Sequence, residues 1–196
     1  VSVDSLSRVY LTTDQGIFRY QDVARPFRVR AVDVDPDTLC VTPEIIERAM
    51  TSRTRVVVPV HFAGHPCDMD GIMEVAGAAG VKVLGDAAHA MGASYDDRKV
   101  GSVADATSFS FYVTKGMTTG EGGTFTSNDE ELVDRVGVMS LHGMSSGAWN
   151  RYSDRGSWFY EVNEPGYKYN MSDIQAALGI HQLDKVDRFR ARREEI

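Results

Sequence analysis

Residues 81–89 read VKVLGDAAH, and residues 110–123 read SFYVTKGMTTGEGG. In the first stretch a short apolar run ends in a carboxylate, Asp86, and in the second a strand-like run is followed by Lys115. Open α/β folds bind their ligands just beyond the carboxyl ends of their parallel strands. The two stretches therefore predict an acid and an amine at one edge of an α/β sheet.

An acid and a lysine in these positions are the groups that a pyridoxal 5′-phosphate (PLP) site needs. The lysine forms a Schiff base with PLP, and the carboxylate keeps the pyridine nitrogen protonated so that the ring can accept electrons from the substrate. The alternatives are a helix-capping aspartate at Asp86 and a surface lysine in a glycine-rich turn at Lys115. No comparable setting surrounds the other four lysines, Lys82, Lys99, Lys168 and Lys185.

The surrounding segments alternate between strand and helix patterns. Residues 55–61 (RVVVPVH) form a β-branched run, which predicts a strand buried on both faces of a parallel sheet. Capping patterns predict a helix that begins with Asn128 as its cap and another that runs from Ser172 to the end of the chain. Further helices are predicted over residues 43–50 and 68–79, and further strands over residues 81–84, 106–111 and 123–127. This order is typical of βαβ units.

The stretch DAAHAMGASYDDRKVGSVADATSFSFYVTKGMTTGEGG (86–123) resembles the core signature of the DegT/DnrJ/EryC1/StrS family of PLP-dependent sugar aminotransferases. Residues 32–50 (VDVDPDTLCVTPEIIERAM), 57–84 (VVPVHFAGHPCDMDGIMEVAGAAGVKVL) and 164–196 (EPGYKYNMSDIQAALGIHQLDKVDRFRARREEI) resemble the same family. The resemblance implies PLP-dependent transferase fold type I. Its large domain is a three-layer α/β/α structure around a mostly parallel sheet, and we expect it to be incomplete in this chain.

The chain has 196 residues, about half the length of family members, and is expected to be partial. We expect an atypical N-terminal segment over residues 1–30 and a partial PLP-binding large domain over residues 31–171. Residues 172–196 are expected to form a helix leading toward a missing C-terminal domain. The segment that holds the cofactor phosphate in the family is not recognisable in residues 1–30.

The resemblance implies two further cofactor contacts. His89 falls where the family has a histidine or glutamine against the cofactor ring or its phenolic oxygen. Ser110 falls where a serine bonds the cofactor phosphate. The alternatives are a core histidine bonded to backbone and an ordinary strand serine, since Ser108 has the same strand parity. Glycines 120, 122 and 123 are expected to let the loop turn beneath the cofactor, with Glu121 as a structural acid.

The turn GYKYN (166–170) corresponds to the place where the family has an asparagine that reaches the cofactor phosphate of the neighbouring subunit. Here Lys168 occupies that place and Asn170 follows two residues later. Either side chain suits a phosphate, Lys168 as a charge and Asn170 as a hydrogen-bond donor. The resemblance thus implies a homodimer.

The function implied is amino transfer, from glutamate, onto a nucleotide-linked keto-sugar. The expected setting is the cytoplasm, in the biosynthesis of cell-surface polysaccharides or antibiotic sugars. A dehydratase of the same scaffold that uses pyridoxamine phosphate (PMP) replaces the lysine with histidine, so Lys115 argues against it. The alternative is a truncated, non-catalytic PLP-binding or regulatory relative, because parts of the family pattern are missing.

Composition excludes some classes of partner. The net charge of −7 and the pI of about 5.2 argue against nucleic acid or an anionic membrane surface as the main partner. No apolar run approaches the 18 or so residues that a membrane span requires. Without a secretory context, Cys40 and Cys67 are expected to be reduced thiols.

Two other features have ordinary explanations. His61 and His65 have a metal-like spacing, but Gly64 and a following proline oppose a helical display, so no metal is expected. Residues 140–165 are expected to form a long loop. Trp149 and Trp158 in this loop are expected to pack against it, with the floor of a nucleotide-sugar pocket as the alternative.

Overall fold

The computed structural model describes residues 2–3, 9–13, 16–19, 28–144 and 161–196. The chain divides into two units, Val1–Val32 and Asp33–Ile196, which are described separately. The first unit holds an antiparallel sheet in the order β1 (Ser2–Val3), β2 (Val9–Thr13) and β3 (Gly16–Arg19). Within the described ranges no helix is both long and apolar enough to span a bilayer.

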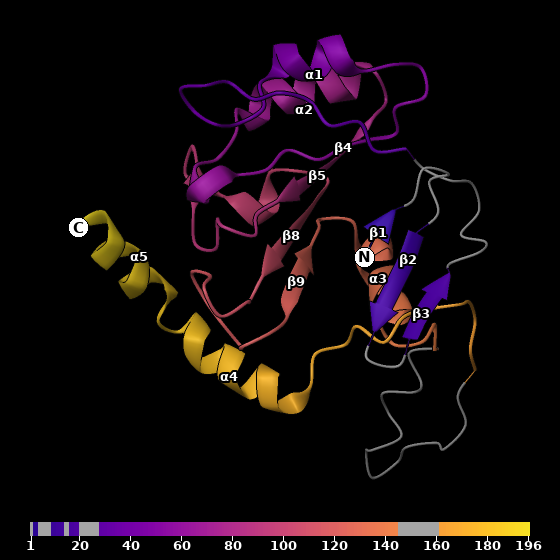
Figure 1. The fold of residues 1–196 in the computed structure, drawn as a ribbon. Coiled ribbons are helices and arrows are strands. Elements are labelled where there is room, and N and C mark those ends of the chain that lie inside the picture. The colour runs from indigo at the N-terminus through magenta and orange to yellow at the C-terminus, as the bar shows by residue number, and fades with distance from the viewer. Residues whose placement is uncertain (1, 4–8, 14–15, 20–27, 145–160) are drawn as a thin grey trace. The chain divides into compact units, whose positions relative to one another are not determined.

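The second unit is built around a four-stranded sheet in the order β4-β5-β8-β9 (Figure 1). Its strands are β4 (Val56–Val57), β5 (Lys82–Asp86), β8 (Ala106–Ser110) and β9 (Gly123–Thr126). The first three run parallel, and β9 pairs antiparallel with β8. In the centre of the sheet Asp86 pairs with Ser108. The expected α/β fold with a mostly parallel sheet is confirmed.

Two helices, α1 (Pro43–Ala49) and α2 (Met69–Ala78), pack together beside β4 and β5 (Figure 1). The Thr42 hydroxyl accepts the Ile45 N–H (3.4 Å), and the Asp68 carboxylate accepts the Gly71 N–H (3.1 Å). Both caps satisfy N–H groups that have no partner inside their helices. The helices and β5 enclose the main hydrophobic core, whose members include Ile46, Met69, Ile72 and Val83.

The β-branched run at residues 55–61 differs from its prediction. Only β4 and an isolated bridge between Val60 and Asp86 form, because Pro59 has no N–H to donate to a neighbouring strand. Val56, Val58 and Val60 are 50%, 53% and 44% exposed. The prediction of a strand buried on both faces is therefore wrong for the chain as described.

A two-stranded hairpin and two single turns of 3-10 helix connect these elements. They are η1 (Phe62–Gly64), β6 (Ser94–Tyr95), β7 (Arg98–Lys99) and η2 (Val100–Ser102). The hairpin turns at Asp96 and Asp97, both left-handed with φ of 45° and 62°. Aspartate tolerates this conformation better than most residues.

Helix α3 (Glu130–Ser140) begins one residue later than predicted. Its cap is Asp129, whose carboxylate accepts the Leu132 N–H at 3.1 Å. The Asn128 amide instead donates to the Ser102 carbonyl (3.4 Å), so the predicted Asn128 cap is wrong.

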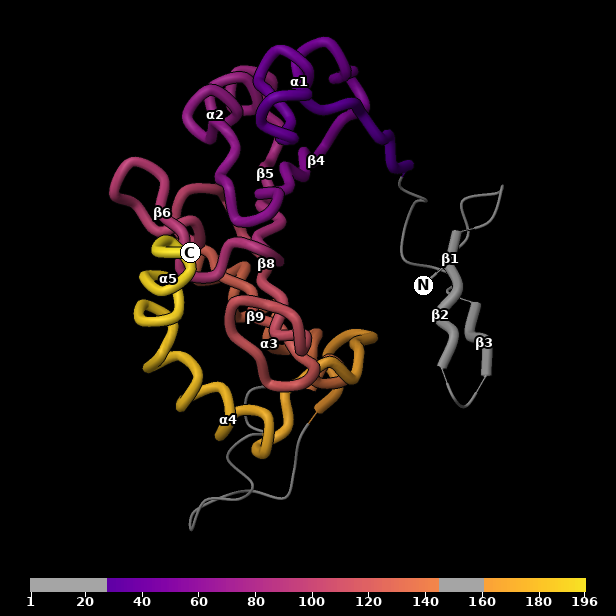
Figure 2. Tube along the Cα trace, turned by 60° about the vertical axis from the view of Figure 1, so that its left-hand side comes forward, coloured from indigo at the N-terminus to yellow at the C-terminus, as the bar shows by residue number. Residues whose placement is uncertain are grey.

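The C-terminal helix is interrupted. It consists of α4 (Asp173–Leu183) and α5 (Val186–Glu194), and Figure 2 shows the change of direction between them. The predicted capping box between Ser172 and Gln175 is present. The prediction of a single helix that runs to the end of the chain is wrong. Val186, the first residue of α5, packs with Phe111 and Met117 in a small core.

Candidate functional site at the carboxyl edge of the sheet

Asp86 is the last residue of β5, and both its backbone N–H and its backbone carbonyl form hydrogen bonds to residues 59–61. Its N–H donates to the Pro59 carbonyl (2.8 Å), and its carbonyl accepts the His61 N–H (3.0 Å). Its half-buried carboxylate accepts the Ala88 N–H at 3.0 Å. Residues 87–93 form turns and no helix, so Asp86 does not cap a helix. The carboxylate therefore stands at the carboxyl edge of the sheet, where α/β folds bind ligands.

Lys115 lies in the loop that leaves β8 at the same edge. Its backbone N–H donates to the Tyr112 carbonyl (3.0 Å), and the N–H of Thr119 donates to the Phe111 carbonyl (3.0 Å), which closes the loop. The side chain is half-buried. Within residues 28–144 and 161–196 no hydrogen bond or ion pair involves Lys115 Nζ. The amine is thus available to a ligand.

The lysine loop packs against the segment that follows Asp86. A Cβ built on Gly116 would lie 3.7 Å from the Met91 carbonyl oxygen. Met91 also packs with Met117 in the small core beside α5. The carboxylate and the amine therefore belong to neighbouring segments.

Ser110 ends β8 beside these two segments. Its Oγ accepts the Tyr112 N–H (3.3 Å), so its own hydroxyl hydrogen remains free to donate. Ser108 differs, because its hydroxyl donates to the Gly85 carbonyl (3.4 Å) inside the sheet. Of the two serines of equal parity, Ser110 is the one available at the edge.

His89 contacts the turn η1, which follows the bridge of Val60 to Asp86. Its Nδ1 accepts the Ala63 N–H (3.3 Å), and its ring meets the Phe62 ring edge-on at 6.1 Å between centroids. The residue is exposed, so the core-histidine alternative does not apply, although the ring is bonded to backbone.

The loop at residues 120–123 is tied to α4. The carbonyl of Glu121 accepts the Thr119 hydroxyl (2.6 Å) and the Gln175 side-chain amide (2.9 Å). Gly122 has φ of 136° and Gly120 of 82°, values that L side chains rarely adopt. Helix α4 therefore supports the loop that follows Lys115.

Lys168 and Asn170 lie outside this group. The Lys168 ammonium donates to the Asn170 side-chain carbonyl, and the Asn170 amide donates to the Met171 carbonyl (3.2 Å). The turn is anchored to the end of α3, where the N–H groups of Tyr169 and Asn170 donate to the Ser140 carbonyl. Nothing in the described ranges joins either side chain to Asp86, Ser110 or Lys115. Trp149 and Trp158 lie outside the described residues.

Two buried polar residues lie next to Asp86 in places that the sequence did not predict. His61 is 1% exposed and Thr107 is 0% exposed. His61 Nε2 and Thr107 Oγ1 would each lie 3.3 Å from a Cβ built on Gly85, so both side chains fill the space that this glycine leaves open. The sequence carries no local signal for this placement, because Thr107 lies inside β8 opposite Gly85 and only the pairing of the strands brings it there.

The surroundings of His61 favour a neutral imidazole with its hydrogen on Nε2. Burial lowers the pKa of its imidazole, and the neighbouring Asp86 carboxylate opposes this effect only in part. Its Nδ1 accepts the Cys67 N–H (3.2 Å), which places the ring hydrogen on Nε2. Among the described residues no group of three or more His, Cys, Asp or Glu is placed so that it could hold a metal ion.

The two cysteines are buried and free. The Sγ atoms of Cys40 and Cys67 both contact the Val60 carbonyl, at 3.8 and 3.3 Å. Burial and the neighbouring Cys40 thiol raise the pKa of the Cys67 thiol to about 12. A thiol that remains protonated at neutral pH is a poor nucleophile, so a structural role fits Cys67 best.

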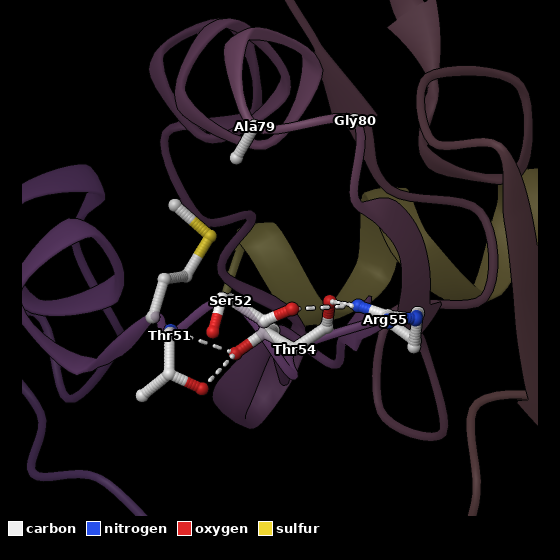
Figure 3. A pocket seen from close by; sticks show the side chains of 7 residues that line it. Thr51, Ser52, Thr54, Arg55, Ala79 and Gly80 are labelled. Carbon is white, nitrogen blue, oxygen red and sulfur yellow. Dashed lines mark hydrogen bonds between the residues drawn. The ribbon is translucent and has the colours of Figure 1, made fainter.

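A hollow of about 460 Å³ lies at the opposite end of the strands, before β4 and β5 begin (Figure 3). Thr51, Ser52, Thr54 and Arg55 line one side of it. The Arg55 guanidinium donates to the carbonyls of Ser52 and Thr54, both at 3.0 Å. This hollow is not part of the predicted site.

The groups at the carboxyl edge fit PLP in chemical terms. The Asp86 carboxylate suits the protonated pyridine nitrogen, the Lys115 amine suits the aldehyde, and the Ser110 hydroxyl suits a phosphate oxygen. Within the described structure, the Asp86 carboxylate can accept further hydrogen bonds, the Ser110 hydroxyl can donate one, and the Lys115 amine has no partner.

Comparison with known proteins also identifies a family of PLP-dependent aminotransferases. Residues 23–196 match the DegT/DnrJ/EryC1/StrS aminotransferase family. The chain is 58% identical over 164 residues to the spore coat polysaccharide biosynthesis protein SpsC of Bacillus subtilis, which covers 84% of this chain and 42% of that protein.

Solved structures agree. A candidate sugar aminotransferase of Streptococcus pneumoniae in its PMP form is 36% identical, with a TM-score of 0.74 over 84% of this chain and 46% of that one. Its PLP form has a TM-score of 0.69. DesI, solved in the presence of its TDP-sugar product, is 35% identical, with a TM-score of 0.67 over 80% of this chain and 37% of that one. The chain thus spans less than half the length of these relatives, and PLP is the cofactor of the family.

Proposed function

We propose, since the chain belongs to the DegT/DnrJ/EryC1/StrS aminotransferase family, that it carries the cofactor-binding part of an enzyme that aminates a nucleotide-linked keto-sugar. The amino group would come from glutamate. The observation that carries the proposal is the placement of Asp86, Ser110 and Lys115 at one edge of the sheet. The TDP-sugar product in whose presence DesI was solved supports the substrate class.

Each of the three side chains would have a distinct task. Bound PLP supplies an electron sink for the carbon next to the amino group. The Asp86 carboxylate would hold a proton on the pyridine nitrogen, because an ion pair at this partly buried edge favours the charged form. Ser110 would donate its hydroxyl hydrogen to the phosphate. Both contacts orient the ring relative to Lys115.

Lys115 would act twice. Its amine would be the point of covalent attachment, and once released by the incoming amine it would move a proton to and from the reacting carbon. The absence of an ion pair to its Nζ within the described ranges supports this role, since a paired ammonium would resist losing its proton.

Assembly would complete the site. We propose an isologous dimer in which Lys168 or Asn170 reaches the phosphate bound by the second copy. In the described ranges the side chains of Lys168 and Asn170 bond only to each other and to the Met171 carbonyl, which supports a role toward a different site. A structure of the dimer with both side chains remote from the second copy's Ser110 and Lys115 would contradict this arrangement.

The test needs a protein of the relatives' length. In a chimera, the matched segment of the Bacillus subtilis protein is replaced by the corresponding residues of this chain. The chimera is incubated with PLP, ¹⁵N-glutamate and a panel of nucleotide-linked keto-sugars, and the products are analysed by mass spectrometry. We expect a ¹⁵N-labelled amino sugar and 2-oxoglutarate, and no product from Lys115→Ala. Amination that persists in Lys115→Ala, or PLP binding without any amination, would contradict the proposal.

A further inference from the structure

The segment at residues 61–67 (HFAGHPC) donates backbone N–H groups to two histidine rings. The Ala63 N–H donates to Nδ1 of His89 (3.3 Å), and the Cys67 N–H donates to Nδ1 of His61 (3.2 Å). A backbone N–H can only donate, so each Nδ1 must be an acceptor without a hydrogen. In the neutral ring the hydrogen is then on Nε2.

The contact to His89 depends on an uncommon backbone conformation. Ala63 has φ of 52° and ψ of 17°, the left-handed region that residues with a Cβ seldom occupy. Gly64 follows with φ of 89°, and a Cβ at that position would lie 3.1 Å from the His89 carbonyl oxygen. The turn therefore approaches His89 closely, and Ala63 adopts a costly conformation at the point of contact.

The opposite edge of the His89 ring remains available. His89 is exposed, and no hydrogen bond to its Nε2 exists within residues 28–144 and 161–196. The residue lies three positions after Asp86, in the segment whose Met91 contacts the loop that carries Lys115. With Nδ1 occupied, Nε2–H is the only polar group that the neutral ring can present there, and it is a donor.

We propose that Ala63 is a positioning residue that holds His89 in the Nε2–H tautomer, so that His89 donates a hydrogen bond to the ionised phenolic oxygen of the cofactor. A donor at this place favours the charged oxygen, whereas the other tautomer would present a lone pair and repel it. The tautomer itself is independent of cofactor binding. The use of Nε2–H rests on the proposed function.

The tautomer is tested first, on the 196-residue chain without PLP. Long-range ¹H–¹⁵N NMR spectra at a pH of about 8, above the ordinary histidine pKa, report which ring nitrogen carries the hydrogen. His89→Gln assigns the signal. We expect His89 to show a single Nε2–H tautomer, and the Ala63 amide signal to shift when His89 is protonated, because a protonated Nδ1 cannot accept. A mixture of tautomers overturns the proposal, and so does an Ala63 amide signal that stays in place when His89 is protonated.

A matched pair of variants tests the role of the turn. Ala63→Gly accepts a positive φ and should keep the single tautomer, whereas Ala63→Val opposes it and should give a mixture. In the chimera, Ala63→Val should weaken PLP binding about 2- to 10-fold relative to Ala63→Gly, the worth of one hydrogen bond. Equal PLP affinity in the two variants overturns the donor role. If Ala63→Val fails to fold, the wild-type spectra and Ala63→Gly still decide the tautomer. A chimera that binds no PLP would contradict the proposed function while leaving the NMR result intact.

Discussion

At the residue scale, the sheet edge of Asp86 and Lys115 could be predicted from the sequence because each comes shortly after the end of a predicted strand. A strand end is a local feature, and the carboxyl edge of a parallel sheet collects such ends. His61 and Thr107 could not be recognised in this way. Their burial next to Gly85 depends on the strand order and register, which link residues that are distant in the sequence.

Replacing Asp86 with asparagine in the chimera should retain some PLP but slow the glutamate half-reaction by orders of magnitude, because a neutral pyridine is a poorer electron sink. The measurement is the rate at which glutamate converts the PLP absorbance to that of PMP. Asp97→Asn is the matched control, since it changes an aspartate in the β6–β7 turn whose left-handed backbone asparagine tolerates. A near-normal rate in Asp86→Asn would show that this carboxylate is only structural.

His61 should make the stability of the chain depend on pH. Its pKa is lowered in the folded state from an ordinary value of 6.5, chiefly by burial. Its contribution is therefore complete above about pH 6.5 and is lost as the pH falls through the lower folded-state pKa. Urea unfolding between pH 8 and pH 5 should show a fall in unfolding free energy that His61→Asn lacks. The asparagine oxygen can still accept the Cys67 N–H, so an unchanged pH slope in this variant would contradict the assignment.

At the scale of elements, local capping signals were reliable where the cap and its target were unambiguous. Ser172 caps its helix as predicted, and Thr42 and Asp68 cap the helices predicted over residues 43–50 and 68–79. The β-branched run at residues 55–61 misled because its composition favours a strand, while Pro59 interrupts the hydrogen bonding. The interruption after α4 had no local signal, because it reflects the packing of Val186 against Phe111 and Met117.

The start of α3 offers a direct comparison of two adjacent residues. Asp129→Ala removes the carboxylate that accepts the Leu132 N–H and should lower the unfolding free energy by about 1 kcal/mol. Asn128→Ala removes only a long bond to the Ser102 carbonyl and should cost clearly less. Chemical denaturation of both variants measures the difference. A larger loss in Asn128→Ala would restore Asn128 as the cap.

At the scale of the whole molecule, the family and its PLP dependence were recognisable from the sequence because several motifs occur in the right order. The family match over residues 23–196 and the similarity to solved relatives confirm both. The sheet nevertheless exposes apolar side chains that a sequence pattern assigns to the interior, such as Val56 and Val58. Burial depends on what packs against a strand, which the strand's own residues do not specify.

The 196-residue chain by itself should bind PLP weakly and transfer no amino group. It spans 42% of the Bacillus subtilis relative, and the segment that holds the cofactor phosphate in the family is not recognisable in residues 1–30. Positioning of reacting groups can account for roughly 7–11 kcal/mol of barrier lowering. Incubation with PLP, glutamate and the sugar panel should give no aminated product, and measurable turnover would mean that far more of the site is contained here.

The most direct measurement of the central claim is the site of covalent cofactor attachment. The chimera is loaded with one equivalent of PLP, reduced with borohydride, digested and mapped by mass spectrometry. The label should be on Lys115, and Lys115→Arg should abolish it while Lys168→Arg does not. A label on Lys168, or on any lysine other than Lys115, would contradict the assignment of this edge of the sheet as the cofactor site.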